Sequence, residues 1–175
     1  MKERPIIFSA PMVRALLRGD KTQTRRVVKT LLRGCPYGKP GDRLWVKESY
    51  IRHASIHDFN GYCADGAQCT DYWERKLSAR YMPRRASRIL LEIAELRIHR
   101  LTDISEADAE AEGVMCIDPE LGVSLYWVPG FHDTWTAQFY SACEAFRDYW
   151  NSLNPKHPWG GNPWVWAITF KVVQP

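Results

Sequence analysis

Short apolar stretches separated by turn-forming residues recur along the chain and predict a series of β-strands. We expect these strands at residues 5–8, 24–28, 43–50, 88–98 and 164–173. The intervening segments 31–42 and 115–133 are rich in glycine and proline, which indicates loops. Residues from about 52 to 83 are polar without a clear period, and we predict a long irregular insertion there.

Apolar residues spaced three and four positions apart predict three helices, at 11–18, 104–114 and 134–153. Gly19 follows the first helix where a C-cap glycine is typical. Ser105 and Asp108 resemble a capping box at the start of the second. The third helix carries a largely aromatic stripe that we assign to the hydrophobic core: Trp135, Phe139, Ala142, Phe146, Tyr149, Trp150 and Leu153.

Strands at both ends of the chain, with further strands and helices between them, form an α+β pattern. The length of 175 residues suits a single domain over 1–175, with residues 52–83 as its insertion. A small β-barrel of about five to six strands with peripheral helices fits this order. The last strand can then pair with an earlier strand and remove exposed sheet edges.

Charge is distributed unevenly along the chain. The first 88 residues contain 19 Lys or Arg against 8 Asp or Glu, whereas the remainder contains 5 against 12. The net charge of +4 therefore conceals a strongly cationic first half. Such a half favours a polyanionic partner. The alternative interpretation is that the two halves neutralise each other across the fold.

Several classes of protein and site are disfavoured by composition. No run approaches the 18 apolar residues expected of a membrane-spanning helix, and the apolar stretch after Met1 is too short for a signal peptide. We therefore expect a cytoplasmic protein with no membrane partner. His53, His57, Cys63 and Cys69 offer atoms suited to zinc, but their spacing matches no recognised zinc motif. We predict neither a metal nor a cofactor.

Side chains suited to catalysis or binding are concentrated in segment 19–26, directly after the first predicted helix. Arg25 and Arg26 project to opposite faces if they lie on a strand, so one is expected to face a pocket and the other solvent or phosphate. Lys21 and Thr24 share a face only if the chain turns near Gln23. The candidate binding residues in this segment are Thr22, Arg25 and Arg26.

A second basic run occupies residues 75–88, with aromatic side chains among the cations. This mixture suits nucleic acid, since cations meet phosphates and rings stack on bases. We expect Tyr81, Arg84 and Arg85 to contact nucleic acid or substrate, together with Trp45 from the strand 43–50. A solvated basic loop is the alternative.

The element Gly-x-Lys-Thr-x-Thr-Arg-Arg at residues 19–26 resembles the signature of the ASCH domain family, within the PUA-like superfamily. Residues 40–46, Pro-Gly-Asp-Arg-Leu-Trp-Val, are similar to that family's next landmark. Blocks at 81–89, 101–109, 111–114 and 162–166 resemble a phage and prophage branch of the family. This resemblance implies a PUA-like barrel with a cleft for RNA or a modified nucleoside, in a bacterial host cell.

The resemblance also implies a reaction, because one member of the family is an amidohydrolase that removes the acetyl group from acetylcytidine. Its Lys, Thr and Glu correspond to Lys21, Thr24 and Glu112. Amide hydrolysis without a metal needs a nucleophile, a base and a group that holds the oxyanion. Either a neutral Lys21 is the base and Glu112 contacts the substrate, or Glu112 is the base and Lys21 holds the oxyanion.

Two further functions remain open at this point. A non-catalytic RNA-binding module is the main alternative, because a free nucleoside does not require a broad cationic surface. A ribonuclease is less favoured, because the sequence contains no obvious pair of catalytic histidines and no metal cluster.

Overall fold

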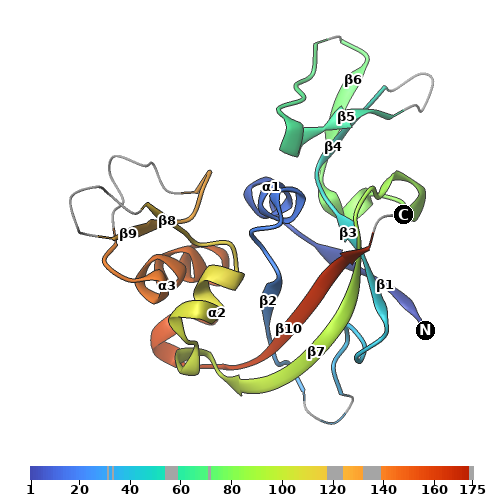
Figure 1. Ribbon diagram of the computed structural model, residues 1–175. Helices are drawn as coiled ribbons and strands as arrows, with labels where there is room; N and C mark the ends of the chain where they lie inside the picture. Colours follow the sequence, from blue (N-terminus) through green and yellow to red (C-terminus); the bar gives the residue numbers. More distant parts are fainter. Residues whose placement is uncertain are drawn as a thin grey trace.

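The computed structural model describes residues 1–30, 32, 34–53, 59–70, 72–117, 124–131 and 139–173. Within these residues the chain forms a five-stranded sheet, a three-stranded sheet, a two-stranded hairpin and three α-helices (Figure 1). The α+β class predicted from the sequence is thereby confirmed. No described helix combines the length and hydrophobicity needed to cross a membrane.

The five-stranded sheet is built from all five of the predicted strands. They are β1 (Glu3–Ile7), β2 (Gln23–Val27), β3 (Arg43–Lys47), β7 (Leu90–Arg100) and β10 (Trp164–Val173), in the order β1-β3-β7-β10-β2. The strand β1 runs parallel to β3, and the other neighbours are antiparallel. The long strands β7 and β10 curve together across the molecule (Figure 1), with an irregularity in β10 at Thr169/Phe170.

The two ends of this sheet, β1 and β2, are bridged by a side chain. The Arg26 guanidinium on β2 donates a hydrogen bond of 3.0 Å to the carbonyl oxygen of Ile7, the last residue of β1. The last strand of the chain, β10, pairs with both β7 and β2, as the sequence pattern predicted for strand 164–173.

Two of the helices end or begin at the residues that the sequence indicated. Helix α1 (Ala10–Arg18) ends at Gly19, whose φ of +86° is left-handed and whose N–H bonds to the carbonyls of Ala15 and Leu16. Glycine adopts this conformation without the strain that a Cβ atom imposes. Helix α2 (Glu106–Ala111) begins with the Ser105 hydroxyl accepting a hydrogen bond from the backbone N–H of Asp108.

Helix α3 (Ala142–Leu153) is shorter than predicted, because the chain is still extended at Ser141. The hydroxyl of Ser141 caps the helix by accepting a hydrogen bond from the backbone N–H of Glu144. Just before it, Phe139 forms an isolated β-bridge with Tyr126, which is incompatible with a helix there. The expected helical residues 134–138 and Trp135 lie outside the described residues.

The insertion at 52–83 was predicted to be irregular, and this prediction is wrong. Strands β4 (Tyr50–His53), β5 (Phe59–Tyr62) and β6 (Glu74–Leu77) form an antiparallel sheet in the order β5-β4-β6, and we call this sheet the arm. The arm projects from the rest of the molecule (Figure 1). Because much of its surface is solvent-exposed, the arm lacks the apolar alternation by which strands are recognised in a sequence.

The segment 115–133, predicted to be a loop, likewise contains a short hairpin of β8 (Met115–Ile117) and β9 (Leu125–Trp127). Strands of three residues are too short to show a period in the sequence.

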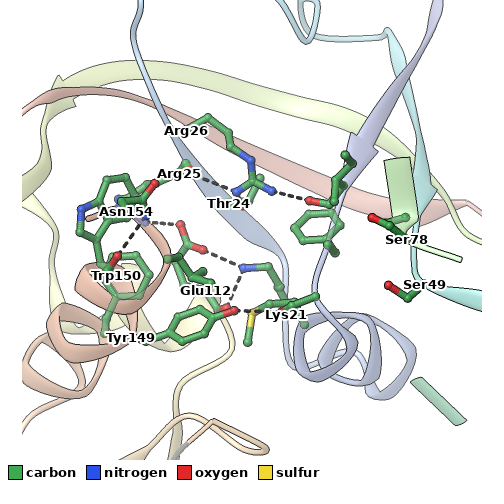
Figure 2. Close-up of a pocket in the computed structure, with 17 residues that line it drawn as sticks. Lys21, Thr24, Arg25, Arg26, Ser49, Ser78, Glu112, Tyr149, Trp150 and Asn154 are labelled. Atoms are coloured by element: carbon green, nitrogen blue, oxygen red, sulfur yellow. Dashed lines mark hydrogen bonds and ion pairs between the residues drawn. The ribbon is translucent and has the colours of Figure 1, made fainter. Parts of the chain in front are cut away.

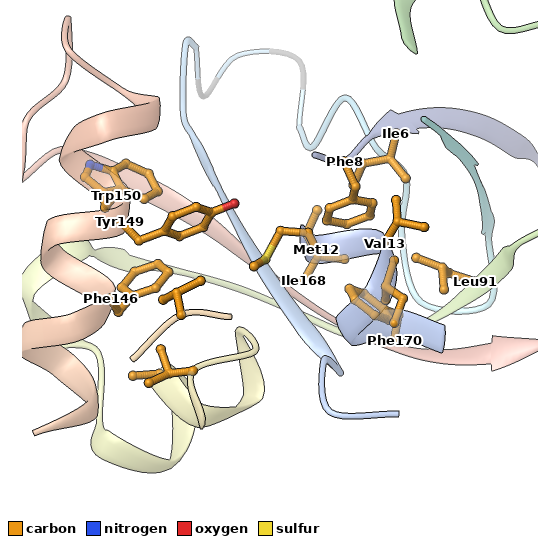
Figure 3. Close-up of a cluster of buried hydrophobic side chains, with 14 of the residues drawn as sticks. Ile6, Phe8, Met12, Val13, Leu91, Phe146, Tyr149, Trp150, Ile168 and Phe170 are labelled. Atoms are coloured by element: carbon orange, nitrogen blue, oxygen red, sulfur yellow. The ribbon is translucent and has the colours of Figure 1, made fainter. Parts of the chain in front are cut away.

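The hydrophobic core lies between the curved sheet and the helices α1 and α3 (Figure 3). Ile6, Leu91 and Ile168 contribute from three strands of the sheet, and Val13 contributes from α1. The stripe of α3 was predicted to be core, and this is confirmed for Ala142, Phe146, Tyr149 and Trp150. It is wrong for Leu153, the last residue of the helix, which is 54% exposed.

Gly113, which follows the C-cap residue Glu112 of α2, has a φ of +100°, and a Cβ atom there would lie 3.3 Å from Cβ of Ala15. We expect Gly113→Ala to lower the free energy of unfolding by about 1–2 kcal/mol, because L-residues are strained in this region. Thermal and urea denaturation measure the loss. Gly160→Ala is the matched control, since Gly160 has no positive φ and no atom within 4 Å of an added Cβ. Equal losses in the two variants would contradict this account.

Candidate functional site

A cavity of about 420 Å³ opens between the start of α1, strand β2 and the second half of α3 (Figure 2). Its size lies in the range of small-molecule sites. Phe8, Phe146 and Trp150 supply an apolar, aromatic wall. Polar side chains reach the cavity from β2, from the end of α2 and from both roots of the arm.

Lys21 is placed in the cavity by the turn after α1. The backbone N–H groups of Asp20 and Lys21 both bond to the carbonyl of Ala15, which folds the chain back beneath the helix. The side chain of Lys21 is only 1% exposed. Its Nζ donates two hydrogen bonds of 2.7 Å, one to the carbonyl oxygen and one to Oε2 of Glu112.

Burial lowers the pKa of Lys21, because the charged ammonium loses its contact with water. The carboxylate of Glu112 opposes this effect, whereas the neighbouring Arg26 and Arg25 add to it. The net direction is downward, so this lysine loses its proton more readily than an exposed lysine does.

Glu112 is held by two cations. Its Oε2 accepts from Lys21, and its Oε1 accepts a hydrogen bond of 3.2 Å from Arg25, which also forms an ion pair of 2.9 Å with Asp108. Burial raises the pKa of Asp108, but Arg97 and Arg25 outweigh it and leave the pKa below its usual range. Glu112 is the C-cap residue of α2, where a carboxylate opposes the helix dipole, and the two cations compensate for that position.

Thr24 also lines the cavity and is nearly fully buried. Its Oγ1 accepts a hydrogen bond of 2.7 Å from Arg26. A guanidinium that donates to a hydroxyl oxygen favours negative charge on that oxygen. Strand β2 begins at Gln23, so Lys21 precedes it, and strand alternation does not hold Lys21 and Thr24 on opposite faces. The turn near Gln23 that the sequence analysis required is not found, because Gln23 already pairs with Thr169 as the first residue of β2; Lys21 and Thr24 nevertheless both line the cavity.

The structure brings together five of the sequence-predicted site residues around one cavity: Lys21, Thr24, Arg25, Arg26 and Glu112. Arg25 is buried against α2, whereas Arg26 is half-buried and reaches toward β1. The prediction that only one of the two arginines faces a pocket is therefore wrong. The reason is that Arg26 folds back over its own strand, to the carbonyl of Arg25 and to Thr24.

The other predicted binding residues do not line this cavity. Thr22 is exposed, and its backbone is engaged with Ala111 and Phe170. Trp45 is half-buried on β3, where Nζ of Lys47 lies 5.3 Å from its ring centre. The remaining three, Tyr81, Arg84 and Arg85, are exposed on turns between the arm and β7. Arg84 forms an ion pair with Glu3.

Several lining residues were not identified from the sequence. Ser49 and Ser78 lie at the two roots of the arm, and they meet at the cavity because Tyr50 of β4 pairs with Leu77 of β6. Tyr149 was assigned to the core alone, yet it also lines the cavity, and its hydroxyl lies 3.1 Å from that of Ser9. Long-range pairing of this kind leaves no signal in a single sequence.

No protein-family model matches this chain, and no curated protein does. Among solved structures, the crystal structure of an ASCH domain from Lactobacillus crispatus JV V101 is similar over 99% of this chain and 81% of that one. Its TM-score is 0.50 at 12% identity. A DUF984 protein from Enterococcus faecalis V583 matches at 12% identity and a TM-score of 0.49, covering 99% and 82% of the two chains. At such identity the likeness concerns architecture alone, and it agrees with the resemblance of residues 19–26: this chain has the fold of an ASCH domain.

Proposed function

We propose that the cavity binds a cytidine-type nucleoside, free or within RNA, and hydrolyses an acyl group from its exocyclic amine without a metal. The observation that carries this proposal is the buried Lys21–Glu112 pair, which lies beside Thr24 in a cavity of about 420 Å³. The aromatic wall suits a flat base, and the cations suit an oxyanion. The ASCH fold and the 19–26 element support RNA or a nucleoside as the substrate class.

In the first step, Thr24 Oγ1 attacks the acyl carbon, and its proton passes to Lys21 Nζ. A neutral lysine amine has two N–H groups, which match the two acceptors on Glu112, and one lone pair that remains for the proton. Arg26, already bonded to Thr24, is positioned to stabilise the negative charge that develops on oxygen. The lowered pKa of Lys21 makes the neutral amine accessible.

In the second step, the carbon–nitrogen bond breaks and the Lys21 ammonium returns its proton to the departing exocyclic amine. Water then adds to the acyl group on Thr24, which releases a carboxylic acid and restores the hydroxyl. Glu112 keeps Lys21 in position throughout. The opposite assignment, with Glu112 as base and Lys21 holding the oxyanion, differs in its pH dependence.

Binding of RNA without catalysis is the second candidate function. It is favoured by one observation: among the described residues, no hydrogen bond joins Lys21 to Thr24. Hydrogen bonds of catalytic groups are often long before substrate binds, so both functions fit this geometry.

Replacement of the proposed base tests the reaction directly. Wild-type protein is expected to convert acetylcytidine to cytidine, and chromatography measures the conversion. The variant Lys21→Met is expected to lower kcat by at least about 100-fold, because it lacks the base. Lys29→Met is the matched control, because Lys29 is exposed in the same basic stretch. Thermal denaturation checks that both variants fold. Absence of conversion by the wild type would reject this reaction and leave RNA binding.

The pH dependence of kcat/KM distinguishes the two assignments of the base. Because burial lowers the pKa of Lys21, the neutral amine forms as pH rises, and kcat/KM is expected to rise with it. The rise should level off below the pH at which an exposed lysine deprotonates, about 10.4. It is measured from about pH 6 to pH 10, with circular dichroism recorded at each pH. A constant kcat/KM over this range would exclude Lys21 as base and favour the opposite assignment.

A further inference from the structure

The arm displays cations that form no ion pair with any residue in the described part of the chain. The pairing of β4 with β6 sets Arg52 directly opposite Arg75 on one face of the arm. Lys76, the next residue of β6, lies opposite Ile51 and projects to the other face. None of these three side chains forms an ion pair or hydrogen bond with another part of the described chain. Like charges directly opposite one another destabilise a sheet. A local cost that no described residue compensates is typical of a functional site.

The arm is nevertheless fixed firmly to the body of the protein. Arg88, just before β7, bonds to both oxygens of the buried Glu48 at the root of the arm, at 2.9 and 3.2 Å. The same guanidinium bonds to both oxygens of Asp65, at 2.6 and 2.8 Å, and lies 3.8 Å from the ring centre of Tyr62. Arg14 of α1 donates to the carbonyl of Ala64. These contacts hold the arm's cations in a defined position relative to the cavity.

The arm also begins at the rim of the cavity. Ser49 immediately precedes β4 and Ser78 immediately follows β6, and both line the cavity (Figure 2). The exposed Arg80 and Tyr81 follow directly on the same segment. A ligand held in the cavity therefore has a basic surface next to it, which continues along the arm.

Exposed aromatic rings accompany the cations. Tyr72 is 90% exposed and Trp73 54% exposed, directly before β6, with their rings edge to face at 5.4 Å. Cations that meet phosphates and rings that stack on unpaired bases are the two elements of single-strand recognition. In duplexes the bases are already stacked, so such rings favour a single strand.

We infer that the arm binds the phosphate backbone and bases of a single-stranded RNA whose target nucleotide occupies the cavity. This inference rests on the proposed function, because it takes the cavity as the place of the modified nucleoside. It assigns to Arg52 and Arg75, which share one face of the arm, the role of phosphate contacts, and to Tyr72 that of a stacking surface.

Fluorescence anisotropy with a labelled single-stranded oligoribonucleotide tests the arm. The variant Arg52→Gln/Arg75→Gln is expected to bind roughly 10-fold more weakly at about 0.1 M salt. Its slope of log affinity against log salt should be shallower by about 1.4, since each phosphate contact contributes about 0.7. The control removes the same charge from two exposed lysines elsewhere and should bind like the wild type: Lys39→Gln/Lys156→Gln.

Tyr72→Ala is a second variant that leaves the charge unchanged, and we expect it to weaken binding by about 5-fold or more through lost stacking. Thermal denaturation verifies the fold of each variant. Affinity for RNA equal to that of the wild type in both arm variants would overturn the inference. Wild-type protein that binds polyglutamate of matched charge as tightly as RNA would also overturn it, because that result points to an acidic protein as the partner.

The outcomes separate this inference from the proposed reaction. If acetylcytidine is not hydrolysed but RNA binding falls only in the arm variants, the reaction is wrong and the arm's role is supported. If acetylcytidine is hydrolysed and the arm variants bind RNA as the wild type does, the arm's role alone is overturned.

Discussion

A buried chain of ion pairs, Lys21–Glu112–Arg25–Asp108, is the constraint on which the candidate site depends. It joins the start of β2 to α2 and forms part of one wall of the cavity. Buried charges cost several kcal/mol each when unpaired, so loss of one member leaves another uncompensated. Apolar side chains of similar volume often give equal or greater stability. The arrangement is therefore better explained by the position and protonation of Lys21 than by stability.

The cavity lies where the five-stranded sheet has its two ends. Strands β1 and β2 are the first and last in the order of pairing, and Arg26 connects them through its bond to Ile7. The side chains of these adjacent residues therefore extend in opposite directions, since Arg25 reaches α2 and Arg26 reaches β1. Ends of sheets carry backbone groups without a neighbouring strand, and here a side chain and the cavity occupy that place.

The uneven charge of the chain has two explanations, and each applies to different residues. Lys21 and Arg25 from the cationic half are neutralised by Glu112 and Asp108 from the acidic half, as mutual neutralisation requires. The cations of the arm have no such partners among the described residues. Ion pairing inside the fold therefore accounts for the cavity, whereas the arm retains the surface charge that a polyanion would meet.

The sequence by itself determined the elements that have a strong local pattern. The five strands of the main sheet, the end of α1 at Gly19 and the cap of α2 at Ser105 follow from local period and backbone conformation, which a few neighbouring residues specify. Segment 19–26 identified Lys21 and Thr24, and family resemblance added Glu112. Only the tertiary structure decided the strands of the arm, the meeting of Ser49 with Ser78, and the double role of Tyr149 in core and cavity. These depend on contacts between residues far apart in the chain, and a polar strand or a distant partner leaves no period in the sequence for local reasoning to detect.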